Sequence, residues 1–506
     1  MLAPGRLEWG SQGEMMLRRK LVVWLILGLL TAAFSSCGNN NTTIPTIQHG
    51  SLFTFLGDTP VSDVLAVHAT ISSMKLRVVG TTNFVTVFPS SAEPLGQKKM
   101  DFCALRDSST IIDLSSLPEE TYDQVVIGLS IAQLTSYDPT SDPPIKKLAV
   151  KLSTATPAIP IQPNLTLVRN QVNALRLDFD MLRSIQLDAH GQVTGDVIPT
   201  FKATPVIATD PKGFGEFDDL VGFVRSVQPY IAGQSFTGAL SLQLLSGTGP
   251  AVSINFNSAT KLYGVAGLNV LETGRVAEVG ATMDKNGNLI ADTVEVEDRA
   301  IVEQNMLAFL GLVTAVSKDG AGNVTQFSFY VREEEPDIST TVPIDSVVTV
   351  NVLPETALQY SSRPTNFDPA LPFDAKAITV GQELIVNGVY TIVANQPTTV
   401  AASMIFLKLQ TMQGSLGSLV QVGNDGHSGA FWFIPQASLL SGSPILVFAS
   451  SNTTYLNLFG LADIIPQATL LVRGLPFYQT EATTINDVVV PAGTLVVKAR
   501  QIHQLQ

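Results

Sequence analysis

The side chains best spaced for acid–base chemistry are those of Asp178 and Asp180. They are two residues apart in the alternating segment Leu175–Asp180, so in a β-strand both would point to the same face. Hydrolysis of a glycosidic bond needs two carboxyl groups roughly 5 to 10 Å apart, which such a pair allows. The same spacing also suits a strand whose polar side faces solvent, and we favour this second interpretation.

Other motifs do not assemble into a catalytic or metal site. His427 precedes Ser428, but a nucleophile elbow needs a glycine two positions away on each side of the serine, so we predict a loop. The five histidines include no i, i+4 pair of the kind that binds zinc. Asp284–Asn288 lacks the glycine position of an EF-hand and predicts a hairpin turn. We therefore expect no catalytic residues, no metal and no cofactor.

Two side chains are candidate ligand contacts. Asp58 precedes Pro60 in a predicted turn, where an aspartate ordinarily accepts hydrogen bonds from backbone amides and only occasionally contacts a ligand. Trp432 is flanked by Phe431 and Phe433, and exposed aromatic rings can stack on sugars or bases. The alternative, which we favour, is core packing, with the two phenylalanines facing one side of a strand and the tryptophan the other.

The first 36 residues have the order of a secretory signal: basic Arg18–Lys20, apolar Leu21–Leu30, then two serines before Cys37. The segment resembles the signal peptide of bacterial lipoproteins, and the residues before Met15 are an upstream extension. This resemblance implies lipidation of Cys37, including palmitate, and anchoring in the cell envelope. Gly38 stands where an inner-membrane retention signal has aspartate, which implies the outer membrane. The alternative is an uncleaved anchor helix, although the apolar run is shorter than the roughly 20 residues of a membrane span.

The composition of the chain limits its partners and its redox chemistry. The 506 residues carry a net charge of −13, and residues 1–36 hold four basic and two acidic side chains, so the remainder is near −15. Such a chain does not suit nucleic acid, which binds clustered Lys and Arg. With Cys37 lipidated, Cys103 has no cysteine partner, and we predict a buried thiol.

Short alternating segments predict an all-β protein. After a polar tether at 37–49, the segments from 50 to 207 predict a β-sandwich. Its predicted strands include Leu52–Leu56, Val64–His68, Met74–Val79, Val125–Ile131 and Val172–Phe179. The segments Leu52–Pro60, Leu117–Tyr122 and Leu175–Asp180 resemble a family of bacterial lipoprotein domains, domain of unknown function 4382.

An internal repeat follows the sandwich, with one order of features in three copies. Each copy has an early glycine, then a threonine, a strand closed by glycine, and a last strand with an alanine near its start. The copies are marked by Gly222, Thr260, Gly280 and Ala291, by Gly311, Thr356, Gly388 and Ala402, and by Gly417, Thr453, Gly474 and Ala499. The repeat resembles the family called domain of unknown function 5666, which implies small OB-like β-barrels at 217–300, 305–413 and 414–506.

These features predict a lipid-anchored envelope protein on the periplasmic or surface face of the outer membrane. We expect its modules to form a rod that binds a polysaccharide or an envelope protein, or that has a structural or adhesive role. OB-like barrels often bind oligosaccharides through their loops, which makes a polysaccharide a natural partner. The alternative is an envelope polysaccharide hydrolase that uses the aspartate pair. The sequence leaves the oligomeric state open.

Overall fold

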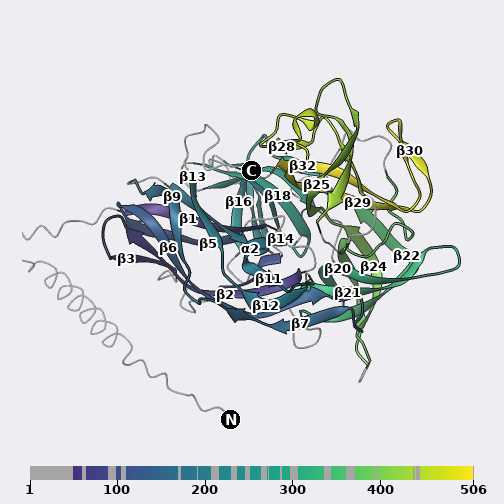
Figure 1. Cartoon of the computed structure of the whole chain (residues 1–506), viewed down its shortest axis with the longest axis horizontal. Coiled ribbons are helices and arrows are strands. Elements are labelled where there is room, and N and C mark those ends of the chain that lie inside the picture. Colours follow the sequence, from purple (N-terminus) through teal and green to yellow (C-terminus); the bar gives the residue numbers. More distant parts are fainter. Residues whose placement is uncertain are drawn as a thin grey trace, which may run out of the picture. The chain divides into compact units, whose positions relative to one another are not determined.

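The regular structure of the described residues is nearly all β-strand, so the predicted all-β class is confirmed. No helix within the described ranges is long and apolar enough to cross a membrane. Cys37 and nearly all of the predicted tether lie outside the described residues. The computed structural model describes residues 49–59, 64–88, 98–103, 110–168, 172–190, 192–206, 216–229, 236–244, 251–263, 271, 273–284, 288–296, 306–335, 344–360, 371–393, 396–436, 439 and 445–504 (Figure 1).

The N-terminal part is a β-sandwich built from one sheet whose two halves share a core. One half has the order β13 (Phe201–Val206), β10 (Val172–Asp180), β1 (His49–Thr59) and β5 (Thr110–Pro118). The other has the order β3 (Phe84–Phe88), β2 (Val64–Val78), β6 (Thr121–Tyr137) and β9 (Ala158–Thr166), with β4 (Lys98–Asp101) and β7 (Ile145–Ala149) beside them. Strand β9 pairs with both β6 and β13 and so joins the halves.

Apolar residues from both halves fill a single core, as expected for strands with alternating patterns. Leu175 and Phe179 of β10 meet Val67 and Ile71 of β2 in this core, and all four side chains are fully buried. Cys103 is buried beside them, as predicted. Smaller elements complete the sandwich: β8 (Lys151–Leu152), α2 (Met181–Ser184), β11 (Ile185–Leu187) and β12 (Val193–Val197).

Three small closed barrels follow the sandwich, as the repeat predicted (Figure 1). Barrel 1 contains β14 (Glu216–Pro229), β15 (Gly238–Leu244), β16 (Val252–Phe256), β17 (Lys261–Tyr263), β18 (Val276–Met283) and β19 (Leu289–Val296). Barrel 2 contains β20 (Met306–Lys318), β21 (Val324–Glu335), β22 (Val347–Tyr360), β23 (Glu383–Thr391) and β24 (Thr399–Leu407). Barrel 3 contains β25 (Gln410–Val422), β26 (Gly429–Pro435), β27 (Ile445–Ala449), β28 (Thr454–Leu456), β29 (Thr469–Gln479) and β32 (Thr494–Gln504), with η3 (Leu461–Asp463) and the hairpin β30 (Thr483–Ile485) and β31 (Val488–Val490).

Each barrel closes through a parallel strand pair: β16 with β19, β22 with β24, and β27 with β32. Beside this pair the chain runs through a short irregular segment, and a threonine hydroxyl in that segment forms a hydrogen bond with the last strand of the barrel. It donates to the backbone carbonyl of an alanine in Thr260–Ala291 (2.7 Å), Thr356–Ala402 (2.7 Å) and Thr453–Ala499 (2.9 Å). The same hydroxyl accepts the backbone N–H three residues earlier, from Asn257, Leu353 and Ser450 respectively. The threonine and alanine of the sequence repeat are therefore hydrogen-bonding partners.

A glycine in the first strand of each barrel lies against the carbonyl of the facing strand. A Cβ atom on Gly222, Gly311 or Gly414 would stand only 2.2, 2.0 or 2.2 Å from that oxygen, so no larger residue fits there. A β-bulge follows two residues later in all three strands. The sequence repeat assigned this position in the third copy to Gly417, which was wrong, because Gly414 has the equivalent register.

Contacts also join modules that are not neighbours in the sequence. Arg332 of barrel 2 donates from Nε to the Leu65 carbonyl of the sandwich at 3.0 Å. Glu278 of barrel 1 forms an ion pair with Arg500 of barrel 3. A rod of modules would make contacts only between successive modules, so the expectation of a rod was wrong.

We expect Thr356→Val to lower the free energy of unfolding by about 1–3 kcal/mol, because the buried Ala402 carbonyl loses its donor at nearly unchanged side-chain shape. Denaturant unfolding followed by circular dichroism measures this change. The matched variant Thr356→Ser keeps the hydroxyl and should lose clearly less. Equal losses in the two variants would contradict a role for the hydrogen bond.

Candidate ligand-binding site on the third barrel

The predicted carboxylate pair lies on one face of β10, but each member is held by a nearby arginine. Asp178 accepts a hydrogen bond from Arg176 Nε at 2.7 Å. Asp180 caps α2 by accepting the Arg183 backbone N–H at 3.0 Å, and its other oxygen lies 3.4 Å from Arg183 Nε. Both carboxylates are half-buried on the polar side of the strand. This arrangement suits the interpretation that we favoured, a solvent-facing polar side.

Asp58 lies within β1, opposite Phe179 of β10, at a position that the sequence placed in a turn. The strand instead continues through Thr59, because the parallel pairing with β10 extends to the end of that strand. The Asp58 carboxylate, Pro60 and Cys37 lie outside what the structure describes.

Trp432 packs between modules. Its neighbours Phe431 and Phe433 are buried in the core of barrel 3, which confirms the predicted alternation. Trp432 points to the other face of β26, where it is half-buried against an apolar cluster that includes Leu446 of barrel 3 and Phe309 of barrel 2. Its position therefore favours packing over ligand contact.

The acidic turns use their carboxylates to hold the chain. Asp284 accepts the backbone N–H of Asn288 at 2.8 Å and its side-chain amide at 2.9 Å, which confirms the predicted hairpin turn. Asp319 binds Asn323 in the same way in barrel 2, at 2.8 and 3.0 Å. Within the described ranges, no group of three or more His, Cys, Asp or Glu side chains is arranged to hold a metal ion.

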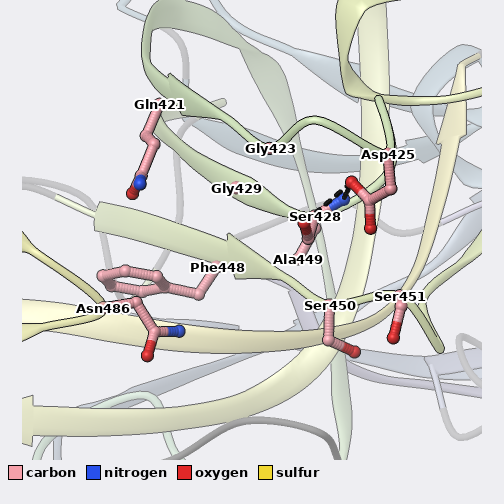
Figure 2. Close-up of a pocket in the computed structure, with 10 residues that line it drawn as sticks. All are labelled: Gln421, Gly423, Asp425, Ser428, Gly429, Phe448, Ala449, Ser450, Ser451 and Asn486. Atoms are coloured by element: carbon pink, nitrogen blue, oxygen red, sulfur yellow. Dashed lines mark hydrogen bonds between the residues drawn. The ribbon is translucent and has the colours of Figure 1, made fainter.

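A polar cavity of about 320 Å³ opens at one end of barrel 3 (Figure 2). Its walls come from the β25–β26 loop, the end of β27 and the turn between β30 and β31. Phe448 and Ala449 also line the cavity, so an apolar surface lies beside the polar one. Six polar side chains line it: Gln421, Asp425, Ser428, Ser450, Ser451 and Asn486.

The β25–β26 loop is held in place by one carboxylate. Asp425 Oδ1 accepts the backbone N–H groups of His427 and Ser428 at 3.0 and 2.9 Å, and the Ser428 hydroxyl at 2.8 Å (Figure 2). The hydrogen bonds from Ser428, followed by the one from His427, lower the pKa of Asp425. The carboxylate is therefore ionised at neutral pH. The segment around His427 and Ser428 is a loop, as predicted, and it does not form a nucleophile elbow.

An exposed phenylalanine lies on the adjoining loop. Phe459 is 89% exposed, the most exposed of the large apolar side chains that the structure describes. Its loop is fixed to the cavity loop, because Leu461 N donates to Gly426 O at 3.0 Å. Phe459 N also donates to the Asp463 carboxylate at 3.2 Å. The backbone at Phe459 is therefore tied to the same loop that lines the cavity.

Sequence reasoning missed this site. The polar residues that form it are far apart in the chain, from Gln421 to Asn486, and the sequence around His427 and Ser428 predicted only a loop. One local signal was present: Gly460 follows Phe459 and Asn457 stands two residues before it, so a large aromatic residue falls in a turn. An aromatic residue in a turn is poorly placed for the core of a barrel.

The arrangement is suited to a hydroxyl-rich ligand. Serine hydroxyls and Gln or Asn amides both donate and accept hydrogen bonds, and Asp425 can only accept. An exposed aromatic ring offers an apolar face for stacking. The cavity volume of about 320 Å³ is within the usual range of small-molecule sites.

Comparison with known proteins identifies a relationship for the sandwich. Residues 49–194 match the family described as Domain of unknown function (DUF4382). None of the curated proteins matches the chain. A solved structure, drosophila Unr CSD456, matches with 9% identity over 57% of this chain and 97% of that chain, at a TM-score of 0.13. The resemblance predicted from Leu52–Pro60 and the segments after it is thus confirmed for the N-terminal domain.

Proposed function

We propose that the protein is a lipid-anchored component of the bacterial cell envelope that binds a polysaccharide through the loop end of barrel 3 and catalyses no reaction. The observation that carries this proposal is the polar cavity beside the exposed Phe459 ring. Small barrels commonly bind oligosaccharides with the loops at one end. A protein partner at the same loops, or an adhesive or structural role, is the broader form of this proposal.

The charge of the chain favours a neutral polysaccharide. The net charge of −13 repels polyanions such as nucleic acids and phosphate-rich polymers. Asp425 adds a fixed negative charge at the cavity itself. A neutral sugar chain meets no such repulsion and supplies the hydroxyl groups that the lining can bind.

The anchor rests on the order of residues around Cys37. The basic, apolar and small-residue segments precede this cysteine in the order of a lipoprotein signal. Lipidation would place the protein on the outer membrane, facing the periplasm or the surface. One acyl chain binds a membrane only weakly, so the anchor would need several.

The three barrels support a common origin as repeats. They share the threonine-to-alanine hydrogen bond and the position of the glycine in the first strand. We therefore propose that all three resemble domain of unknown function 5666. The polysaccharide hydrolase remains the second candidate, and the arginine contacts of Asp178 and Asp180 give it no support.

We expect Phe459→Ala to weaken polysaccharide binding by about fivefold, since a lost stacking contact is worth roughly 1 kcal/mol. Co-sedimentation with insoluble peptidoglycan, chitin and cellulose measures the binding. The matched control is Phe84→Ala, which removes a phenylalanine that is 45% exposed on the sandwich. Equal binding by the two variants, or no binding of any of the three polymers by the parent, would contradict the proposal.

We expect Cys37→Ser to move the protein from the membrane fraction to the soluble fraction, because the serine hydroxyl cannot take the thiol-linked lipid. Cell fractionation with radioactive palmitate labelling measures both attachment and lipidation. Cys103→Ser is the control and should remain labelled and attached. Membrane attachment of Cys37→Ser at the parental level would contradict lipid anchoring, and protease treatment of intact cells then separates the surface face from the periplasmic face.

A further inference from the structure

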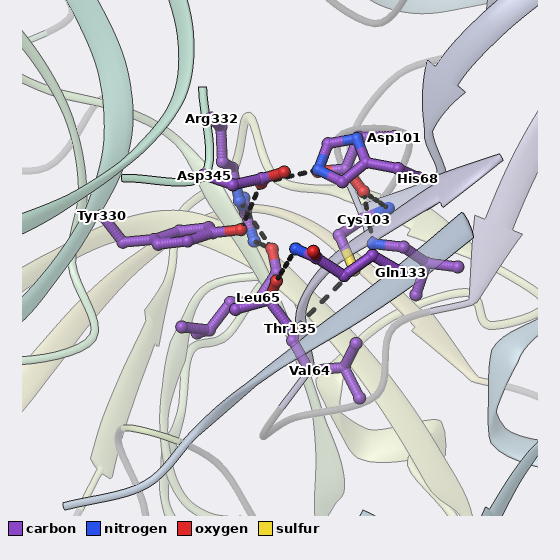
Figure 3. A network of polar contacts seen from close by, with 11 residues as sticks. Val64, Leu65, His68, Asp101, Cys103, Gln133, Thr135, Tyr330, Arg332 and Asp345 are labelled. Atoms are coloured by element: carbon purple, nitrogen blue, oxygen red, sulfur yellow. Dashed lines mark hydrogen bonds and ion pairs between the residues drawn. The ribbon is translucent and has the colours of Figure 1, made fainter. Parts of the chain in front are cut away.

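The sandwich and barrel 2 meet at a buried polar junction (Figure 3). Arg332 of β21 reaches the edge of β2, where Nε and Nη2 donate to the Leu65 carbonyl at 3.0 and 2.8 Å. Its Nη1 lies 3.3 Å from Glu383 Oε1 of β23. The Arg332 side chain is 1% exposed, so one guanidinium connects both modules away from water. The ion pair lies within barrel 2, whereas the hydrogen bonds to the Leu65 carbonyl cross to the sandwich, so opening the junction would leave buried N–H groups of the guanidinium without their acceptor.

A second set of contacts lies beside the arginine. Asp345 Oδ1 is 2.6 Å from His68 Nε2 of β2 and accepts the Tyr330 hydroxyl at 2.5 Å. The backbone of Asp345 has φ 67°, a left-handed conformation, and its N–H donates to the Val331 carbonyl at 2.9 Å. Its carboxylate is thereby held toward the sandwich (Figure 3). The carboxylate oxygen of Asp345 in barrel 2 thus binds the His68 imidazole of the sandwich, a group that gains and loses a proton near neutral pH.

Charged groups surround His68 from both modules. Asp345 and Asp101 are the acidic groups that face it, and Arg332 is the basic group. Asp101 is 7% exposed and accepts the Val67 N–H with Oδ1 at 2.8 Å, whereas its Oδ2 accepts no hydrogen bond from any described residue. Lys147 is the further charge that faces Asp345. The imidazole therefore lies between two carboxylates at a partly closed interface.

We propose that this junction is a proton-controlled lock between the sandwich and barrel 2, closed when His68 is protonated and loosened when it loses its proton. An apolar cluster that includes Leu65, Leu312 and Tyr330 also joins the modules, and its contacts do not depend on pH. The lock therefore changes how often the junction opens, and it leaves the modules associated. It requires neither the proposed ligand nor the proposed anchor.

The direction of the pH effect follows from the two partners. Burial lowers the pKa of His68, but the hydrogen bond to Asp345 and the charges of Asp101 and Asp345 outweigh it, so the pKa lies above the ordinary 6.5. The contribution of His68 to the stability of the closed junction is complete below pH 6.5 and is lost as the pH rises through the raised pKa. Burial raises the pKa of Asp345, but the contacts with His68 and Tyr330 outweigh burial, so the pKa lies below the ordinary 3.8. The contribution of Asp345 to the stability of the closed junction is therefore present above pH 3.8 and is lost as the pH falls through the lowered pKa. Burial raises the pKa of Tyr330 well above 10, so this phenol donates throughout.

Cys103 provides a reporter of opening at this junction. It is 1% exposed, and its Sγ lies 3.7 Å from the carbonyl of Val64, the residue before the one that Arg332 binds. The chain has two cysteines, so in the full-length Cys37→Ser protein Cys103 is the only thiol. A thiol reagent reacts with it only when this region opens. The ratio of rates for two variants at one pH cancels the ionisation of the thiol itself.

The experiment compares labelling of Cys103 by a disulfide reagent in the Cys37→Ser protein with and without His68→Gln. Glutamine keeps an N–H donor but does not titrate. We expect His68→Gln to react several times faster at about pH 6 and at nearly the same rate as the parent at about pH 8.5, because each pKa unit of coupling is worth a tenfold change in opening. The matched control His190→Gln changes an exposed histidine of the sandwich and should follow the parent at both pH values.

A ratio of rates that is the same at both pH values would overturn the lock, as would an unchanged rate in His68→Gln. Circular dichroism and thermal unfolding at each pH confirm that the variants are folded. Asp345→Asn supplies a second measurement, because it removes the charge that the protonated imidazole binds while the side-chain oxygen stays. It should react faster than the parent at about pH 6 and show no further acceleration from added His68→Gln. Additive effects of the two substitutions would also overturn the proposal.

Discussion

The closure of each barrel by a parallel strand pair is the constraint on which the rest of the structure depends. An open sheet of five short strands would leave two edges with unpaired backbone groups. Closure removes both edges, but the chain must leave regular pairing to reach the last strand. In barrel 2 this interruption falls between Val352 and Ala357 of β22, and the Thr356 hydroxyl fills it by binding one backbone group on each side. The same solution appears in the other two barrels.

Closed barrels have outer faces that are free to pack and loops that are free to vary. Trp432 on the outer face of barrel 3 packs against an apolar cluster that includes residues of barrel 2. The ring of Tyr360 in barrel 2 packs edge-on against the ring of Phe477 in barrel 3, with 5.2 Å between the ring centroids. These contacts leave the β25–β26 loop with its cavity open to ligands. Phe448 belongs both to the cavity lining and to the apolar cluster that barrels 2 and 3 share, so the cavity lies beside the contact between the two barrels.

The local patterns of the sequence predicted the fold class and the repeat well. Alternation predicts strands because successive side chains point to opposite faces, and the threonine and alanine of each copy proved to be bonded partners. Element lengths were less accurate: Val64–His68 and Met74–Val79 are both parts of the single strand β2. The two predicted strands leave residues 69–73 between them, whereas pairing with β6 carries one strand through this gap.

The contacts that define the functional surfaces were beyond sequence reasoning. His68 and Asp345 are 277 residues apart, and only the packing of two modules brings them together. The cavity lining likewise combines a hairpin loop, a strand end and a turn. The register that makes Gly414 the equivalent of Gly222 also depends on a facing strand and not on spacing alone. Each of these features depends on tertiary contacts that have no periodic signal.

The most direct test of the central claim is hydrogen–deuterium exchange of the full-length protein with and without soluble oligosaccharide fragments of chitin and cellulose, which are neutral, followed by mass spectrometry. Binding at the loop end of barrel 3 predicts slower exchange in the peptides that contain Ser428, Ser450 and Phe459, with the sandwich unchanged. Slower exchange confined to the β10 region around Asp178, or equal exchange throughout with fragments that are shown to bind, would contradict the assignment of the site to barrel 3.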